Sequence, residues 1–186
     1  MILRERPATE NTPPQFPLAV QYCIRAAVRS DVRKLEWYGS HSHTRRYIER
    51  AYVDMTKGRQ LMLVADLNGF PIGQIYVQFD SKNKQHADGK ARGYIYSFRV
   101  IGHLQGLGIG TRLLRTAEIE LARRGFRYAV LQVSKRNEAA RRLYHREGYL
   151  VIDEDPGQWS FVDHNGMERH VNDPTFVMEK RLAPSL

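Results

Sequence analysis

The fold of this 186-residue chain is decided by one stretch, VIGHLQGLGIGT at residues 100–111. An alternating apolar pattern typical of a strand ends where the stretch begins, and a helical pattern starts at its last glycines. Glycine adopts the positive φ values that turn successive backbone N–H groups toward one anion, and it has no side chain to keep that anion away. We therefore expect a loop that binds a phosphate group.

The residues around this loop exclude two common kinds of phosphate site. A nucleotide-hydrolysing P-loop needs Lys and then Ser or Thr after its last glycine, but Gly110 is followed by Thr111 and Arg112. A dinucleotide fingerprint needs a glycine at residue 113 and an acidic residue at the end of the next strand, where Leu113 and residues 131–133 stand. A tight turn without a ligand stays open as the alternative.

Hydrophobic periodicity and turn residues place the remaining elements. Strands are expected at 22–27, 60–67, 72–79, 92–100, 128–133, 149–152, 159–163 and 175–180, and helices at 31–37, 44–57, from the glycine loop to 124, and at 137–147. Asn68-Gly69 predicts an antiparallel hairpin, and Asn165-Gly166 predicts a turn between the last two strands. Residues 1–20 hold four of the eight prolines. We expect a flexible N-terminal extension at 1–20 and a single domain at 21–186.

Composition excludes several classes of protein. No apolar run approaches the roughly 18 to 20 residues that cross a bilayer, and residues 1–7 lack the apolar core of a secretion signal, so we expect a cytoplasmic protein. The single cysteine, Cys23, can form neither an internal disulfide nor a thiolate zinc site. His41 and His43 have the spacing of a metal pair but no third ligand nearby, so no metal is expected.

Two signatures in this sequence resemble those of one known family. The first is the Gln-x-x-Gly-x-Gly pattern at 105–110, and the second is the Asn-x-x-Ala-x-x-Leu-Tyr-x-x-x-Gly-Tyr pattern at 137–149. In order and spacing they resemble the GNAT superfamily of acetyl-CoA-dependent N-acetyltransferases. The resemblance implies an α/β (α+β) fold, with a mixed, mostly antiparallel central sheet of about seven strands flanked by four helices. It also implies acetyl-CoA as co-substrate, with ribosomal-protein and small-amine acetyltransferases as equally plausible relatives.

The resemblance also assigns the residues that bind acetyl-CoA. In the family, loop amides hold the pyrophosphate, and the pantetheine arm pairs like an extra strand with the strand before the loop. Asn137 matches a position that binds the pantetheine, and the alternative that it only caps the last helix stays open. Arg112, Arg141 and Arg142 are candidates for the ribose 3′-phosphate. The cofactor-binding set expected here is Phe98, Arg99, Val100, Gln105, Gly106, Leu107, Gly108, Ile109, Gly110, Thr111 and Asn137.

Tyr144 is the expected catalytic residue. It stands where the family places a tyrosine whose hydroxyl can hydrogen-bond the departing sulfur, and a half-buried helix aromatic is the alternative. Some members carry a glutamate as general base five residues before the motif asparagine, but this chain has Gln132 there, which cannot accept a proton. The general base is therefore open. Its candidates are Glu36, His41, His43, and a water chain along Tyr94, Tyr96 or Ser97.

The charge distribution separates the function hypotheses. The net charge is +9, and residues 99–146 contain eleven Lys and Arg against three acidic residues. We expect an N-acetyltransferase that transfers the acetyl group directly to a small-molecule or peptide amine in a ternary complex, without membrane or nucleic-acid partners. A non-catalytic acyl-CoA sensor is the alternative that Gln132 suggests. A nucleic-acid-binding protein, suggested by the net charge, is less favoured.

The acidic residues suggest the charge of the acceptor. In the family, the amine enters between the loop that joins the first two helices and the final pair of strands, and those borders here carry Glu36, residues 153–155 and Asp163. Carboxylates in these places would attract cations. The sequence thus predicts a cationic acceptor, either a protein N-terminus or lysine or a polyamine-like molecule. An ordinary solvated turn is the alternative.

Overall fold

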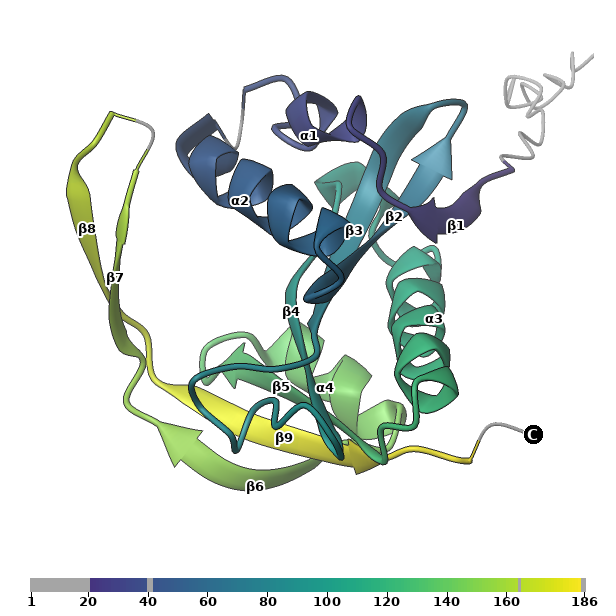
Figure 1. The fold of residues 1–186 in the computed structure, drawn as a ribbon, viewed down its shortest axis with the longest axis vertical. Coiled ribbons are helices and arrows are strands. Elements are labelled where there is room, and N and C mark those ends of the chain that lie inside the picture. The colour runs from purple at the N-terminus through teal and green to yellow at the C-terminus, as the bar shows by residue number, and fades with distance from the viewer. Residues whose placement is uncertain (1–20, 40–41, 164, 185–186) are drawn as a thin grey trace, which may run out of the picture.

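The computed structural model describes residues 21–39, 42–163 and 165–184. The expected extension at residues 1–20 lies outside this part of the chain, and so does His41. Within the described part, one large sheet carries helices on both of its faces (Figure 1).

The large sheet has seven strands and is mixed but mostly antiparallel, as the family resemblance implies. Its strands are β1 (Cys23–Ala26), β2 (Gln60–Leu67), β3 (Phe70–Gln78), β4 (Arg92–Val100), β5 (Tyr128–Ser134), β6 (Leu150–Asp155) and β9 (Thr175–Arg181). They lie in the order β1-β2-β3-β4-β5-β9-β6. β4 and β5 pair in parallel, while the other neighbours in this sheet pair antiparallel. The single parallel pair is therefore at the centre of the sheet.

Four α-helices cover the two faces of this sheet (Figure 1). They are α1 (Asp31–Lys34), α2 (Arg45–Thr56), α3 (Ile109–Arg123) and α4 (Glu138–Arg146), with 3-10 turns at Ser42–Thr44 and Gly102–Leu104. Residues of α3 and α4 share one hydrophobic core, and residues of α1 and α2 share the other. The apolar stripe predicted for α3 is fully buried at Leu113, Leu114, Ala117 and Leu121, which confirms the helical period of that segment.

The first helix is shorter than its sequence predicts. α1 ends at Lys34, and Trp37 and Tyr38 adopt left-handed backbone conformations, with φ of 45° and 59°. Trp37 is nevertheless buried, and its indole Nε1 donates to the carbonyl of Pro71 at 2.8 Å. The prediction of a helix through Trp37 was wrong because the packing of the indole against the sheet overrides local helix preference.

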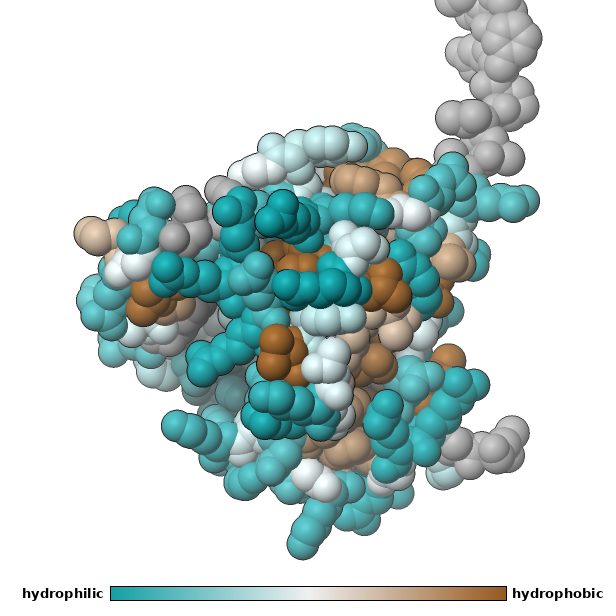
Figure 2. Space-filling view, turned by 45° about the horizontal axis from the view of Figure 1, so that its top comes forward, coloured by the Kyte–Doolittle hydropathy of each residue, from teal (hydrophilic) through white to brown (hydrophobic). Residues whose placement is uncertain are grey.

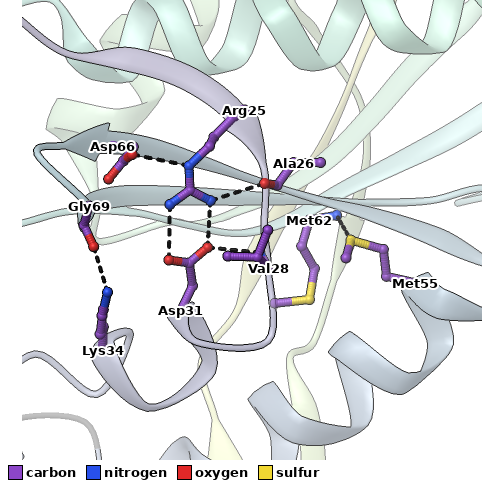
Figure 3. Close-up of polar contacts among 9 residues, drawn as sticks. All are labelled: Arg25, Ala26, Val28, Asp31, Lys34, Met55, Met62, Asp66 and Gly69. Atoms are coloured by element: carbon purple, nitrogen blue, oxygen red, sulfur yellow. Dashed lines mark hydrogen bonds and ion pairs between the residues drawn. The ribbon is translucent and has the colours of Figure 1, made fainter.

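One arginine ties the start of α1 to the sheet (Figure 3). Arg25 of β1 donates to the two carboxylate oxygens of Asp31 at 2.6 and 3.0 Å, and to Asp66 of β2 at 3.1 Å. Asp31 is fully buried, so its charge would be costly without this partner. The same carboxylate accepts the backbone N–H of Val28 at 2.8 Å, which fixes the turn between β1 and α1.

The C-terminal region differs from its prediction. β7 (Gln158–Val162) pairs antiparallel with β8 (Glu168–Asn172) in a separate two-stranded sheet. The turn at Asn165-Gly166 therefore joins β7 to β8, and β9 instead inserts between β5 and β6. β8 was missed because its sequence, ERHVN, is almost entirely polar and exposed, which leaves no alternating pattern to recognise.

Some hydrophobic side chains are exposed at the surface, and three of them, Leu150, Val151 and Ile152, follow one another on the edge strand β6. On the face seen in Figure 2 the hydrophobic side chains lie in small patches separated by hydrophilic residues. The most exposed include Tyr38, Leu107 and Leu150. Exposed apolar residues are normal on a folded domain. Among the helices that the structure describes, none combines the length and the apolar content needed to span a membrane.

The loop before β4 is organised by Asp88. Its Oδ1 accepts the backbone N–H groups of Lys90, Ala91 and Arg92 at 2.9, 2.7 and 2.9 Å. The N–H of Arg92 above all, with those of Lys90 and Ala91, holds the pKa of Asp88 at about 2, because such donors favour the ionised carboxylate. The ionised Asp88 therefore fixes the entry of the chain into β4.

We expect Asp88→Ala to lower the free energy of unfolding at neutral pH by about 1 kcal/mol, once screening by solvent is allowed for. Because the pKa of the folded-state carboxyl is depressed, this stabilisation is complete above the ordinary pKa of 3.8 and is lost as the pH falls through about 2. Urea unfolding at pH 7 and pH 2 measures the difference. Asp88→Asn keeps an acceptor oxygen and should lower the free energy of unfolding by less than Asp88→Ala does. Equal midpoints for Asp88→Ala and the wild type at pH 7 would contradict this account.

Candidate functional site

β4 and β5 run side by side for only part of their length. They pair over residues 92–95 and 128–131. β4 then continues to Val100 along β3, and β5 continues to Ser134 along β9. Two strands that keep their outer partners but lose each other must diverge. The sheet therefore opens at its centre beyond Ile95 and Leu131, and this opening is called the split below.

A β-bulge at Ser97 lies beside the split. Residues 74–76 of β3 face residues 96–99 of β4, so β4 carries one residue more than its partner. Ser97 has a φ of 51°, a left-handed conformation that is uncommon for serine. Gln74, which is fully buried, donates from Nε2 to the carbonyl of Ser97 at 3.0 Å, and its Oε1 accepts from the hydroxyl of Tyr76 at 3.3 Å. A buried amide thus holds the bulge in place.

After the bulge, side chains of β4 divide between the two faces of the sheet. Phe98 and Val100 face α3, since a Cβ on Gly110 would lie 3.2 and 3.9 Å from them. Arg99 faces the other way, and its guanidinium lies 5.1 Å from the centre of the Trp37 ring. The backbone of Phe98, Arg99 and Val100, which is expected to bind the pantetheine, therefore lies between α3 on one face of the sheet and Trp37 on the other.

We expect Gln74→Leu to destabilise the protein by about 1 to 3 kcal/mol, because it leaves the carbonyl of Ser97 and the hydroxyl of Tyr76 without their partner. Ser97→Gly should be tolerated, since glycine adopts a positive φ without strain. Urea unfolding followed by circular dichroism measures both changes. Gln78→Leu, on the same strand but partly exposed, is the matched control. Wild-type stability in Gln74→Leu would show that the bulge does not depend on the buried amide.

The glycine loop presents a run of unpaired backbone donors. Gly106 and Gly108 have φ of 80° and 79°. The backbone N–H groups of residues 106–111 have no hydrogen-bond acceptor in the described part of the chain, and Arg112 is the first to bond back, to the carbonyl of Gly108 at 3.1 Å. The last of these donors form the N-terminus of α3, a helix of 15 residues. Such an arrangement favours an anion through both hydrogen bonds and the helix dipole.

Other residues of the predicted loop serve the fold. A Cβ on Gly110 would lie 3.2 Å from the ring of Phe98, so a larger residue here would crowd the packing of α3 on β4. Gln105 donates from Nε2 to the carbonyl of Val100 at 3.0 Å and ties the loop to the end of the strand. Ile109 is buried in the core. The side chain of Leu107 is exposed, and the backbone N–H groups of the loop stay without an acceptor in the described residues.

Tyr144, the expected catalytic residue, lies on α4 against β4. Its ring centre is 6.3 Å from that of Phe98 and 5.9 Å from that of Tyr149. The side chain is 6% exposed, and its hydroxyl makes no hydrogen bond within the described residues. Burial raises the pKa of the phenol, which therefore stays protonated at neutral pH. The hydroxyl is thus a proton donor without a partner of its own.

Asn137 caps α4, as one of its two interpretations predicts. Its Oδ1 accepts the backbone N–H of Ala140 at 3.1 Å. Of the arginines suggested for the 3′-phosphate, Arg141 lies over the ring of Phe176 at 5.6 Å, and Arg142 bonds Glu138 at 3.4 Å. Only Arg112, in the first turn of α3, is next to the glycine loop in the chain.

On the face turned toward α2, the split is lined by tyrosines. The ring of Tyr47, from α2, is 6.3 Å from that of Tyr96, which stacks on Tyr94 at 5.7 Å. The hydroxyl of Tyr94 donates to Oε1 of Gln132 at 3.0 Å, a hydrogen bond that links β4 to β5. Burial raises the pKa of all three phenols. They can therefore orient water or a substrate, but they hold no charge at neutral pH.

His86 also reaches this face, and sequence reasoning missed it. Its imidazole stacks on Tyr94 with ring centres 4.7 Å apart. Burial lowers the pKa of the imidazole, so it is neutral at neutral pH. His86 lies in a polar loop with no motif around it. Only the folding of that loop around Asp88 brings the imidazole to β4.

The other candidates for the general base are Glu36, His41 and His43. Arg45 donates to both carboxylate oxygens of Glu36 at 2.6 and 2.8 Å, which keeps that carboxylate in an ion pair. His43 belongs to the 3-10 turn before α2, and His41 is outside the described residues. In the described ranges, no group of three or more His, Cys, Asp or Glu side chains could hold a metal ion.

Three of the five acidic residues expected to border the acceptor have basic partners. Glu154 pairs with Lys135 at 2.5 Å, and Asp163 pairs with Arg169 at 2.9 Å. Asp163 in addition accepts two backbone N–H groups and closes the turn between β7 and β8. Asp153 and Asp155 have no basic partner among the described residues and accept the backbone N–H groups of Glu154 and Gly157 at 2.8 and 2.7 Å. These two carboxylates therefore leave negative charge on this border, although Glu36, Glu154 and Asp163 are paired.

Comparison with known proteins places this geometry in a family. Residues 20–149 match the family model described as acetyltransferase (GNAT) family. Over 89 residues the chain is 38% identical to an uncharacterized N-acetyltransferase of Methanocaldococcus jannaschii. That match covers 46% of this chain and 50% of that protein, so it spans only about half the length of the curated relative.

Solved structures share the fold. The ribosomal-protein-S18-alanine N-acetyltransferase of Escherichia coli has a TM-score of 0.66 at 16% identity, with 89% of this chain and 96% of that chain covered. NAA60 of Arabidopsis thaliana, solved in complex with acetyl-CoA, has a TM-score of 0.65 at 17% identity, with 87% and 98% covered. At these identities the likeness shows the fold alone.

Proposed function

Because the chain belongs to the acetyltransferase (GNAT) family, we propose that it transfers an acetyl group from acetyl-CoA to an amine, directly and with both substrates bound. The observation that carries this proposal is the run of unpaired backbone N–H groups at residues 106–111, placed where β4 and β5 part. The run offers a site for a phosphate, and the split offers a passage through the sheet next to it.

The loop fits the pyrophosphate of coenzyme A. Its N–H donors are consecutive, and at the start of α3 the helix dipole strengthens their attraction for an anion. A Cβ built on Gly106 or Gly108 would meet nothing within 4 Å, so the space beside both glycines is open. Beyond Ile95, the edge of β4 has no partner from β5. An extended chain with amide groups, such as pantetheine, can pair with that free edge.

The residues around the split support the chemistry. A bound acetyl-CoA supplies the thioester that the amine attacks. Backbone N–H groups next to the bulge, near Phe98, would stabilise the negative charge that develops on the carbonyl oxygen. The protonated hydroxyl of Tyr144 would donate to the sulfur as it leaves. Since Gln132 cannot take the proton of the amine, we assign that step to a water chain along Tyr94 and Tyr96.

We expect Gly108→Ala to weaken acetyl-CoA binding at least tenfold, equal to about 1.4 kcal/mol, since its methyl group would stand where the pyrophosphate approaches. Calorimetry with acetyl-CoA measures the change. Gly125→Ala is the matched control, because Gly125 also has a positive φ, of 84°, and open space around it, but it ends α3 far along the chain from the loop. Both variants carry the same backbone strain. Unchanged affinity in a folded Gly108→Ala would remove the loop from the binding site.

We expect Tyr144→Phe to lower kcat by roughly 10²-fold with little change in acetyl-CoA affinity, because a general acid acts on the transition state and not on the bound cofactor. Release of the free thiol measures kcat. Tyr149→Phe is the control, since that ring touches Tyr144 but is fully buried and cannot reach a substrate. If Tyr144→Phe turned over at the wild-type rate, Tyr144 would be a packing residue.

One alternative keeps the binding but not the turnover. Gln132 replaces the carboxylate that some relatives use as base, which favours an acyl-CoA-binding sensor with this fold. Incubation of the protein with acetyl-CoA and a panel of amines decides between the two. Thiol release that depends on the amine supports the enzyme, whereas saturable binding without release for any amine supports the sensor.

A further inference from the structure

Arg99 is unusual among the arginines of this protein. Its Nε is buried and has no hydrogen-bond partner, and no ion pair to its guanidinium is found in the described part of the chain. Arg25 lies between two carboxylates (Figure 3), and Arg115 pairs with Glu147 at 2.7 Å. A buried guanidinium is costly unless an anion compensates it. Among the described residues, Arg99 therefore lacks the carboxylate partner that Arg25 and Arg115 both have.

The surroundings of Arg99 are aromatic. The guanidinium lies over the ring of Trp37 at 5.1 Å, and the indole is itself fixed by its bond to Pro71. Burial lowers the pKa of Arg99, and the neighbouring phenols of Tyr76 and Tyr47 are protonated and uncharged at neutral pH. The cation–π contact offsets part of the cost of desolvation. It leaves the buried Nε–H of the guanidinium without an acceptor in the described part of the chain.

Arg99 also lies where an acceptor would be held. It follows the bulge at Ser97 by two residues and is on the face opposite to Phe98, Val100 and the glycine loop. Tyr47 connects α2 to β4 on this face, because its ring lies against Tyr96 and its hydroxyl oxygen lies 3.5 Å from Oγ of Ser97. A tyrosine-lined floor thus runs from the split toward Arg99.

We propose that Arg99 binds a carboxylate on the acceptor, so that the substrate is an amine that also carries a carboxylate group. The planar guanidinium presents paired N–H donors that match the two oxygens of a carboxylate. One guanidinium balances the single charge of a carboxylate, whereas a phosphate of nearly two negative charges would need a second cation. This inference rests on the proposed acetyl transfer. It gives the acceptor an anionic group in addition to the cationic amine that the sequence predicts.

The first test compares substrates that differ only in charge. The twenty common amino acids and their carboxamides are assayed as acceptors by thiol release, for the wild type and for Arg99→Met, which keeps an unbranched apolar chain but removes the charge. We expect the best amino acid to have a kcat/KM at least tenfold above that of its carboxamide. Arg99→Met should abolish this preference by raising KM for the acid. Arg123→Met, on the exposed end of α3, is the matched control and should keep the preference.

A second test does not depend on turnover. Trp37 and Trp159 are the two tryptophans of the chain, so Trp159→Phe leaves Trp37 as the only reporter. Amino acids titrated into this variant with coenzyme A should change the Trp37 fluorescence, because the anion contacts the guanidinium that covers the indole. Carboxamides should not, and adding Arg99→Met should abolish the response.

The outcomes separate the two proposals. A fluorescence response to acids without any thiol release supports Arg99 as the anchor and contradicts acetyl transfer. Equal kcat/KM for acids and carboxamides, or an equal loss for both in Arg99→Met, supports acetyl transfer and overturns the anchor. Preference for the aminophosphonate analogue over the acid overturns the carboxylate in favour of a phosphate-bearing amine. The absence of both a response and release with every amino acid overturns the anchor as well.

Discussion

The candidate site depends on one hydrogen bond in the middle of the sheet, from the buried amide of Gln74 to the carbonyl of Ser97. It secures a bulge in β4, which lies just after Ile95, where β4 stops following β5. A closed parallel pair would leave no free strand edge and no passage between the two faces. The split supplies both, and its two sides are lined by different residues. Tyr144 and the glycine loop belong to one side, and the tyrosines and Arg99 belong to the other.

The glycines of the loop show how one motif meets two physical demands. Gly106 and Gly108 are needed for their positive φ, which leaves consecutive N–H groups unpaired. Gly110 leaves space where α3 packs directly on Phe98. Binding and packing are thus coupled within a few residues. The helix can offer its N-terminus to an anion only because it lies so close to the strand before it.

Charged side chains have different surroundings in the scaffold and at the split. Within the scaffold, carboxylates such as Asp31, Asp163 and Glu147 are buried against arginines that neutralise them. At the split, Arg99 is surrounded by an indole and neutral phenols. In the scaffold, the buried carboxylates meet their arginine partners when the chain folds. Arg99 at the split needs an anion from outside the chain. Its charge therefore serves the binding of a ligand more than the stability of the fold.

The sequence by itself determined the strong local patterns. The stripe at Leu113, Leu114, Ala117 and Leu121, the hairpin at Asn68-Gly69 and the two signature motifs follow from spacing along the chain, and the family and the mixed sheet followed from them. Only the tertiary structure revealed the bulge at Ser97, the stacking of His86 on Tyr94, the β7–β8 hairpin and the unpaired Arg99. Each of these depends on partners distant in the chain, such as Gln74 for Ser97 and Trp37 for Arg99. Periodicity reports which side of an element is buried, but it carries no information about which distant residue will be found there.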